Sequence, residues 1–306
     1  LDGGARGWAE SRSDTSRDNP WNLIRLIPAE GIPDACPARR VTCFLLPARR
    51  LTTELPVSLG LTLNNARIDY AGHTLFRDIS ARLEAGSWTA LLGRSGCGKS
   101  SLLRLLAGLE MSDLHQLDLA TDDGQPLTDR VAWMAQQDLL LPWRRVIDNL
   151  WLGDDLRRRP RNRKLAHELL AAVGLEGREQ AWPDALSGGQ RQRVALARTL
   201  YQQAPVVMMD EPFSAVDAIT RLELHDLASR LLKGRTVLMV THDPLEALRL
   251  ADQLLVLRPS SLPGHGAELE RLPGLGAARP VPLDDPALPP AQAQLIARLR
   301  DSEEAA

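Results

Sequence analysis

The sequence predicts an α/β fold in which a phosphate-binding loop joins a buried strand to a helix. Short uninterrupted apolar runs, at residues 206–210 and 236–242, are typical of parallel strands that are covered on both faces. Each run is followed by a helix-like segment, and strands that alternate with helices indicate an α/β architecture. The stretch GRSGCGKSS at 93–101 stands between a strand-like and a helix-like segment, which is the setting that a phosphate-binding loop requires.

The composition is that of an ordinary globular protein. A chain of 306 residues is compatible with one large α/β domain and tails. The formal net charge of −2 shows no excess of positive charge that would attract nucleic acid, so we expect no nucleic-acid partner. No apolar run approaches the roughly 20 residues that cross a bilayer, and the first residues lack the pattern of a signal peptide, so we expect a cytoplasmic chain. Cys36, Cys43 and Cys97 show no C-x-x-C spacing and favour neither a disulfide framework nor a zinc site.

The two ends of the chain differ from its middle in residue composition and hydrophobic pattern. Residues 1–60 are rich in Pro, Arg, Ser and Asp, with PARR at 37 and again at 47, and we expect a poorly ordered leader. An upstream extension is favoured there over a membrane-binding basic arm. Strand-like alternation begins at Leu61, where a mixed sheet should start. From 258 to 306 Pro and Gly become frequent again, before a possible terminal helix.

The segment between about 144 and 185 has a different pattern. It reads as consecutive helices broken at Gly153, Pro160 and Gly174, which predicts a helical insertion between the strands. Before it stands QQDLLLPW, in which Leu139 to Trp143 should begin the insertion and leave an apolar patch exposed for a partner. A core role for Trp143 is the alternative.

The loop at 93–101 fits the pattern G-x-x-x-x-G-K-[ST]. Its glycines let the backbone wrap around phosphate, and the following helix adds its positive N-terminal dipole. Lys99 would neutralise phosphate charge and Ser100 would ligate Mg²⁺. A glycine-rich structural turn is the alternative, and Cys97 is interpreted as a small filler residue. The candidate nucleotide-binding residues here are Gly93, Arg94, Ser95, Gly96, Cys97, Gly98, Lys99, Ser100 and Ser101.

Acidic and imidazole side chains follow two of the predicted strands. Asp210 and Glu211 end the run VVMMDE, where two carboxylates are costly unless they meet a cation or a polarised water. A strand-terminal Asp can hold Mg²⁺, and the next carboxylate can polarise the attacking water. The alternative is an N-cap pair before a helix that begins at Pro212. His242 ends the neighbouring strand, so it should open into the same crevice, although a capping or packing histidine is the alternative.

A second anion site is predicted at LSGGQ, residues 186–190. Ser187 reads as a helix cap, and Gly188 and Gly189 precede the helix, where they expose backbone N–H groups at its positive end. With Gln190 they complete the motif. One chain therefore carries two phosphate-binding helix starts.

Together these motifs resemble the ATP-binding subunit of an ABC transporter over about residues 61–257. The resemblance implies a P-loop (RecA-like) ATPase core with an antiparallel β subdomain and a helical subdomain inserted at about 137–186. It also implies residue roles. Glu211 would be the base, His242 would sense the γ-phosphate, and Gln136 would reach Mg²⁺ and the attacking water. Tyr70 would stack on adenine, and Asp217 would couple two sites across a dimer.

The same resemblance implies cofactors and partners. ATP would bind with Mg²⁺ held by Ser100, Gln136 and Asp210. Two copies would assemble head to tail, so that LSGGQ of one closes on the ATP held by the other. The dimer would bind integral membrane permease subunits at the cytoplasmic face of the inner membrane, and it would meet a periplasmic substrate-binding protein only indirectly.

Within the family, two stretches are similar to the importer branch for nitrate, sulfonates and taurine. These are QQDLLLPWRRVIDNL and MDEPFSAVDAITRLELHDL. THDPLEALRLAD inclines the interpretation slightly towards a pyrimidine precursor of thiamine. The alternatives are a separate cassette of an exporter and a non-transport ABC ATPase, which would place a long coiled coil between the phosphate loop and LSGGQ.

Overall fold

The computed structural model describes residues 58–70, 73–109, 115–260, 266–276 and 279–304. The predicted leader at 1–60 lies almost entirely outside the described residues. At its end, Leu59 is buried and the N–H of Gly60 donates to Asp122 Oδ2 at 3.1 Å. The packed part of the chain therefore includes the two residues before the first strand.

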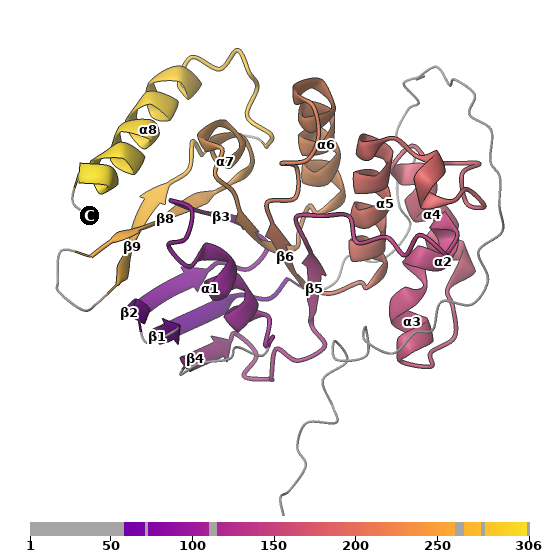
Figure 1. Ribbon diagram of the computed structural model, residues 1–306, viewed down its shortest axis with the longest axis horizontal. Helices are drawn as coiled ribbons and strands as arrows, with labels where there is room; N and C mark the ends of the chain where they lie inside the picture. Colours follow the sequence, from indigo (N-terminus) through magenta and orange to yellow (C-terminus); the bar gives the residue numbers. More distant parts are fainter. Residues whose placement is uncertain (1–57, 71–72, 110–114, 261–265, 277–278, 305–306) are drawn as a thin grey trace, which may run out of the picture.

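The described strands form one mixed sheet, in the order β4-β1-β2-β9-β8-β3-β7-β6-β5 (Figure 1). The five strands from β8 to β5 pair in parallel, as the uninterrupted apolar runs predict. The strands are β1 (Leu61–Tyr70), β2 (His73–Leu83), β3 (Trp88–Gly93), β4 (His115–Thr121), β5 (Val131–Met134), β6 (Val206–Asp210), β7 (Thr236–Val240), β8 (Gln253–Pro259) and β9 (Ala267–Pro273).

Strands β4, β1 and β2 form an antiparallel arm beside the parallel strands. The arm meets the rest of the sheet at β9, where one register pair, Phe76 with Ala267, joins β2 to β9. β9 in turn pairs antiparallel with β8. The mixed sheet and its antiparallel part are both confirmed.

The parallel strands are covered on both faces because their side chains alternate between two apolar clusters. In β6, Val207 and Met209 belong to one cluster, whereas Val206 and Met208 belong to the other. All five residues of β6 and all five of β7 are buried. A strand with two buried faces needs no polar residue, which is why these runs are uninterrupted in the sequence.

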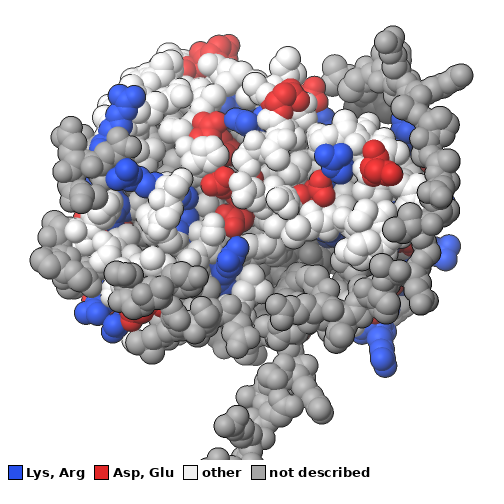
Figure 2. Space-filling model, in the orientation of Figure 1, with Lys and Arg blue, Asp and Glu red and all other residues white. Residues whose placement is uncertain are grey.

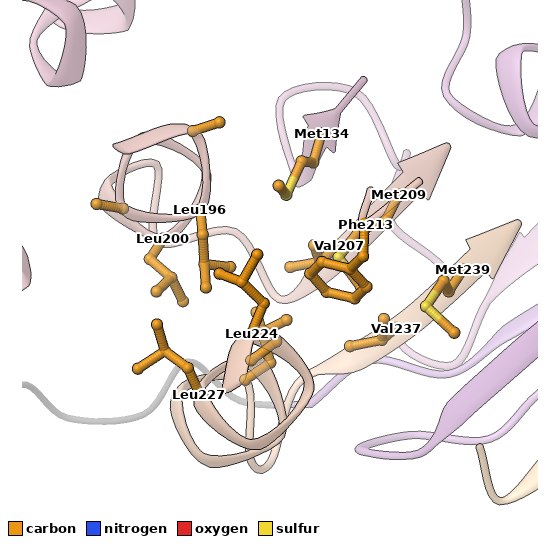
Figure 3. Packing of buried hydrophobic residues seen from close by; sticks show 14 of the residues in the cluster. Met134, Leu196, Leu200, Val207, Met209, Phe213, Leu224, Leu227, Val237 and Met239 are labelled. Carbon is orange, nitrogen blue, oxygen red and sulfur yellow. The ribbon is translucent and has the colours of Figure 1, made fainter. Parts of the chain in front are cut away.

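Helices α5 (Gly188–Tyr201) and α6 (Ala218–Leu231) cover one of these faces. Figure 3 shows Leu196 of α5 and Leu224 of α6 directed towards Val207, Met209 and Phe213. Helix α1 (Lys99–Leu106) lies in the cluster on the other face through its four leucines. The phosphate loop and the LSGGQ segment therefore open helices on different faces of the sheet.

Short helices occupy the segment between β5 and α5. They are α2 (Val146–Leu150), α3 (Leu152–Leu156), α4 (Arg163–Ala172) and the 3-10 turn η3 (Pro183–Ala185). Gly153 was predicted to break a helix, but it lies inside α3. Gly174 follows α4 as predicted and has a φ of 75°. The N–H of Leu175 then donates to Leu170 O at 2.8 Å, which closes the end of the helix.

The residues 139–145 are not helical, so the first helix begins later than predicted, at Val146. Trp143 is 47% exposed and Leu139 is 56% exposed, whereas Leu140 between them is buried. The alternative of a core role for Trp143 is therefore wrong.

The C-terminal part of the chain packs back onto the core. Helix α8 (Leu288–Glu304) lies against α7 (Pro244–Leu250), and Leu288 and Leu295 are buried there (Figure 1). The N–H of Val281 donates to Arg249 O at 2.9 Å, which ties the segment before α8 to the end of α7. Among the described residues, no helix combines the length and the apolar character needed to cross a membrane.

Candidate functional site

The loop 93–101 joins β3 to α1, as predicted. Gly98 caps α1 with a φ of 97°, a left-handed conformation that other residues adopt only with strain. Lys99 Nζ donates to the carbonyls of Gly93 at 2.8 Å and Arg94 at 2.7 Å, so its ammonium lies across the loop. The residues from Arg94 to Gly96 form an exposed tip. A cation and a helix N-terminus therefore meet at one point, which is an arrangement that binds phosphate.

Cys97 is partly buried under this loop. Burial raises the pKa of its thiol, although the nearby Lys99 acts in the opposite direction. A thiol with a raised pKa is a weak nucleophile at neutral pH. The surroundings of Cys97 therefore favour its interpretation as a filler residue.

Asp210 ends β6 directly beside α1. Its Oδ1 accepts a hydrogen bond from Ser100 Oγ at 3.0 Å. Burial raises the pKa of Asp210 by more than the bond from Ser100 lowers it. A hydroxyl and a carboxylate at this spacing are oxygen donors of the kind that Mg²⁺ takes, usually with substrate phosphates and waters as its other ligands. No cluster of three or more His, Cys, Asp or Glu in the described part of the chain could hold a metal by itself.

Glu211 follows Asp210 and brings three segments together. Its side-chain Oε2 accepts from Gln136 Nε2 at 3.1 Å and lies 3.2 Å from His242 Nδ1. Its N–H donates to Val240 O at 2.9 Å. Its φ of 45° is left-handed, which costs a residue with a side chain about 1–3 kcal/mol. The surrounding contacts therefore hold this carboxylate in an unusual backbone conformation.

The helix predicted to begin at Pro212 is absent, because α6 begins at Ala218. Asp210 and Glu211 are thus not an N-cap pair, and that alternative is wrong.

Gln136 and His242 both lie just beyond strand ends. β5 ends at Met134. β7 ends at Val240, two residues earlier than predicted, and both side chains lie in exposed loops. The extra residues let the two side chains turn towards Glu211. The site lies outside the carboxyl ends of neighbouring parallel strands, where open α/β sheets bind ligands.

Ser187 caps α5 with a reciprocal pair of bonds. Its Oγ accepts from the Gln190 N–H at 3.3 Å, and Gln190 Oε1 accepts from the Ser187 N–H at 3.0 Å. The helix begins at Gly188, so both glycines form its first turn and do not precede it as predicted. A Cβ on Gly189 would lie 2.5 Å from Thr220 Cγ2, so this glycine also lets α5 approach α6. That packing role was not predicted.

Asp217 and Tyr70 were predicted from the resemblance alone. Asp217 caps α6, where its Oδ1 accepts from the Thr220 N–H at 3.0 Å, and this bond is the main cause of the lowered pKa of Asp217. Tyr70 ends β1, but its side chain lies outside the described residues. Thr220 thus contacts both Asp217 and the start of α5 at Gly189. The predicted role of the Tyr70 side chain stays a prediction.

Arginines of α5 hold the segment that follows Gln136, a role that was not predicted. Arg191 pairs with Asp138 at 3.0 Å. Arg198 donates to Asp138 O at 2.6 Å and Leu139 O at 2.8 Å, and burial lowers its pKa to about 10. An arginine on an amphipathic helix usually faces solvent, so only the tertiary structure shows these contacts. The exposed Leu139 and the site residue Gln136 therefore share one anchored segment.

No large area of one charge covers the face shown in Figure 2. Basic and acidic side chains both occur among the described residues there, and most of the coloured surface is uncharged. The formal net charge of −2 likewise provides no strong overall field.

Comparisons with known proteins agree with one another. The family described as ABC transporter matches residues 76–214. Aliphatic sulfonates import ATP-binding protein SsuB 2 of Xanthomonas axonopodis pv. citri is 42% identical over 263 residues, which cover 84% of each chain. SsuB 1 of Rhodococcus jostii is 48% identical over 65% of this chain and 79% of its own. A solved dimeric, post-hydrolysis structure of the ATP-binding cassette MJ0796 with ADP and Pi gives a TM-score of 0.57 at 25% identity, covering 71% of this chain and all of that one.

Proposed function

Because this chain belongs to the ABC transporter family, we propose that it is the ATP-hydrolysing subunit of an importer for aliphatic sulfonates. The shared contact of Gln136 and His242 with Glu211, next to the phosphate loop, carries the hydrolytic part of the proposal. The substrate class rests on relatives named for sulfonate import, and these names favour sulfonates over a thiamine precursor.

The phosphates of ATP bind at the loop 93–101. Lys99 exchanges its two carbonyl partners for phosphate oxygens, and the N–H groups at the start of α1 point to the same place. Ser100, Asp210 and the Gln136 amide would hold Mg²⁺, since their oxygen donors fit this ion. When bound, Mg²⁺ neutralises charge that develops on the β- and γ-phosphates.

Glu211 orients and polarises the attacking water, and it accepts the proton as the water adds to the γ-phosphorus. Bond formation to water accompanies cleavage of the bond to ADP, so the products are ADP and inorganic phosphate. Gln136 and His242 both contact Oε2, and neither contact uses Oε1. This arrangement fixes the carboxylate and leaves one oxygen for the water.

Two copies of the chain complete each site. The Ser187–Gln190 helix start of one copy closes on the ATP held by the loop of the other, and Asp217 lies at the contact between them. Within one chain α1 and α5 lie apart, with β5 and β6 between them in Figure 1. The separation supports pairing between copies, as does the dimeric state named for the solved relative. Stacking of Tyr70 on adenine is part of the same proposal.

The segment with Leu139 and Trp143 docks against a membrane permease. Next to Leu139 lies an open hollow of about 380 Å³, lined among others by Gln137, Leu140 and Gly188. Exposed apolar side chains beside a hollow are suited to a short partner helix. The dimer would then lie at the cytoplasmic face of the inner membrane, and a periplasmic binding protein would deliver substrate to the permease.

The variant Glu211→Gln tests the hydrolytic assignment. It keeps the acceptor for Gln136 but removes the base, so ATP affinity should stay within about threefold while turnover falls by roughly 10²–10⁴-fold. Equilibrium binding of a fluorescent ATP analogue and phosphate release measure the two quantities. Glu223→Gln is the matched control, because Glu223 pairs with Arg193 on the surface and should tolerate the change. Wild-type turnover in Glu211→Gln would contradict the proposal.

A further inference from the structure

A buried group of polar side chains lies beneath the turn that carries His242. We name it the α6–α7 polar cluster. Its members are exposed by only 1% (Thr241, His225) or 4% (Glu246, Arg249). None of them belongs to the ATP site described above. Burying ionised groups is expensive, and apolar residues of similar size would usually hold two helices together at least as well. The cluster therefore calls for an explanation beyond packing.

Thr241 connects the cluster to the turn itself. Its hydroxyl donates to the Glu246 carboxylate and accepts from the Asp243 N–H at 3.0 Å. The backbone N–H of Thr241 also donates to Leu91 O at 3.1 Å, on the strand that leads into the phosphate loop. His242 lies between two residues that are fixed in this way. Its side chain is itself exposed, so the turn, and not packing around the ring, determines where the imidazole lies.

His225 lies on the other side of Glu246. Arg249 Nη1 lies 3.3 Å from His225 Nδ1, and because a guanidinium has only donors, Nδ1 must accept. His225 Nε2 lies 3.3 Å from Glu246 Oε1, which is a close approach and not a hydrogen bond. The rings of His225 and Phe213 pack edge to face, and Phe213 stands two residues after Glu211. One carboxylate oxygen of Glu246 therefore accepts from the His242 turn, and the other faces α6.

Arg249 extends the same contacts to the C-terminal part of the chain. Its Nε donates to Val281 O at 3.0 Å, and the Val281 N–H donates back to Arg249 O at 2.9 Å. Val281 is buried and precedes α8, whose Leu288 and Leu295 pack in the same apolar cluster. A continuous series of contacts thus runs from the segment before α8, through Arg249, His225 and Glu246, to the residue next to His242.

We propose that the α6–α7 polar cluster is a positioning device for His242, and that the segment 279–299 braces it through Arg249. The proposal rests on the proposed function, in which His242 contacts Glu211 during ATP hydrolysis. Misplacement of a reacting or orienting group by about 1 Å can reduce a rate by roughly 100-fold without a large change in substrate affinity. Loss of the Thr241 hydroxyl should therefore affect the rate of the chemical step and leave ATP binding nearly unchanged.

The variant Thr241→Val removes the hydroxyl and keeps the shape of the side chain. In the full-length chain we expect kcat for ATP to fall by roughly 10- to 100-fold, with KM and the affinity for a non-hydrolysable ATP analogue within about twofold. Thr241→Ser keeps the hydroxyl and should restore most of kcat. Arg249→Met should lower kcat in the same sense, because it removes the brace to Val281 and the partner of His225. An unchanged kcat in Thr241→Val would overturn the proposal.

A double-mutant cycle separates positioning from general destabilisation. If Thr241 acts only through His242, Thr241→Val should cause no further loss of kcat in the His242→Ala background, whereas independent effects would multiply. Arg235→Met is the matched control, since Arg235 is a buried arginine that donates to Ala204 O outside the cluster. It should lower stability without changing kcat. Full turnover in His242→Ala would contradict the proposed function, whereas multiplicative losses in the cycle would contradict the positioning role alone.

Discussion

Asn149 anchors the segment that exposes Trp143, and its replacement by Asp should lower the stability of the protein. Asn149 is completely buried in α2. Its Oδ1 accepts from the Leu141 N–H at 2.8 Å, and its Nδ2 faces the carbonyls of Leu141, Arg144 and Arg145 at 3.1–3.3 Å. One amide therefore fixes both ends of the turn that carries Trp143.

The change Asn149→Asp keeps the acceptor but removes both N–H donors. The loss of two hydrogen bonds costs about 0.5–1.5 kcal/mol each. The carbonyls of Leu141 and Arg145 keep backbone donors, so the further cost of about 1–3 kcal/mol falls on the Arg144 carbonyl, and we expect a total of roughly 2–6 kcal/mol. The introduced carboxyl would be buried among carbonyl oxygens, which raises its pKa in the folded state. Its ionisation then opposes folding, so the loss of stability should be larger at about pH 8 than at about pH 5.

Urea unfolding followed by circular dichroism measures this loss. Asn162→Asp is the matched control, because Asn162 caps α4 by accepting from the Leu165 N–H, and Asp caps helices equally well. The control should stay within about 0.5 kcal/mol of the parent protein. If Asn149→Asp matched the control at both pH values, the three carbonyl contacts would carry no stability and the reasoning would be refuted.

Two further changes test the site and its partner surface. Asp210→Asn should stabilise the nucleotide-free protein at neutral pH. Burial raises the pKa of Asp210, so its carboxylate form opposes folding above the unfolded-state pKa. Mg²⁺-dependent turnover should fall by roughly 100-fold or more. Thermal unfolding measures the stability and phosphate release measures the turnover, and a destabilised Asp210→Asn would contradict this account. Trp143→Ala should abolish most sulfonate uptake by the assembled transporter, because the exposed indole is proposed to dock on the permease. The ATPase rate of the isolated subunit should stay within about twofold. Leu283→Ala changes another exposed apolar residue and should leave uptake intact, and equal uptake in the two variants would argue against docking at Trp143.

Local patterns predicted the parts of the structure whose cause is local. The parallel strands were predicted because side chains covered on both faces must be apolar. The phosphate loop was predicted because Gly98 and Lys99 satisfy a backbone and a charge requirement within a few residues. The cap at Ser187 follows from the same kind of short-range bond. These features do not depend on distant parts of the chain.

Features that depend on distant contacts were missed. Asn149 and Glu246 look like ordinary polar helix residues in the sequence, and only their partners across the fold give them a specific place. Gly189 lies close to Thr220 of α6, a contact that spacing in the sequence does not show. Gln136 and His242 follow β5 and β7, and both side chains reach Glu211 from the loops after these strands. The predicted leader and the Tyr70 side chain fall outside the described residues.

Phe76 links the antiparallel arm both to the sheet and to the phosphate loop. Its pairing with Ala267 is the one register pair between β2 and β9 in the described part of the chain. The same phenyl ring lies 3.3 Å from the point where a Cβ on Gly98 would be. A side chain at position 98 would therefore press on the ring, so the arm restricts which residue the loop can carry where α1 begins.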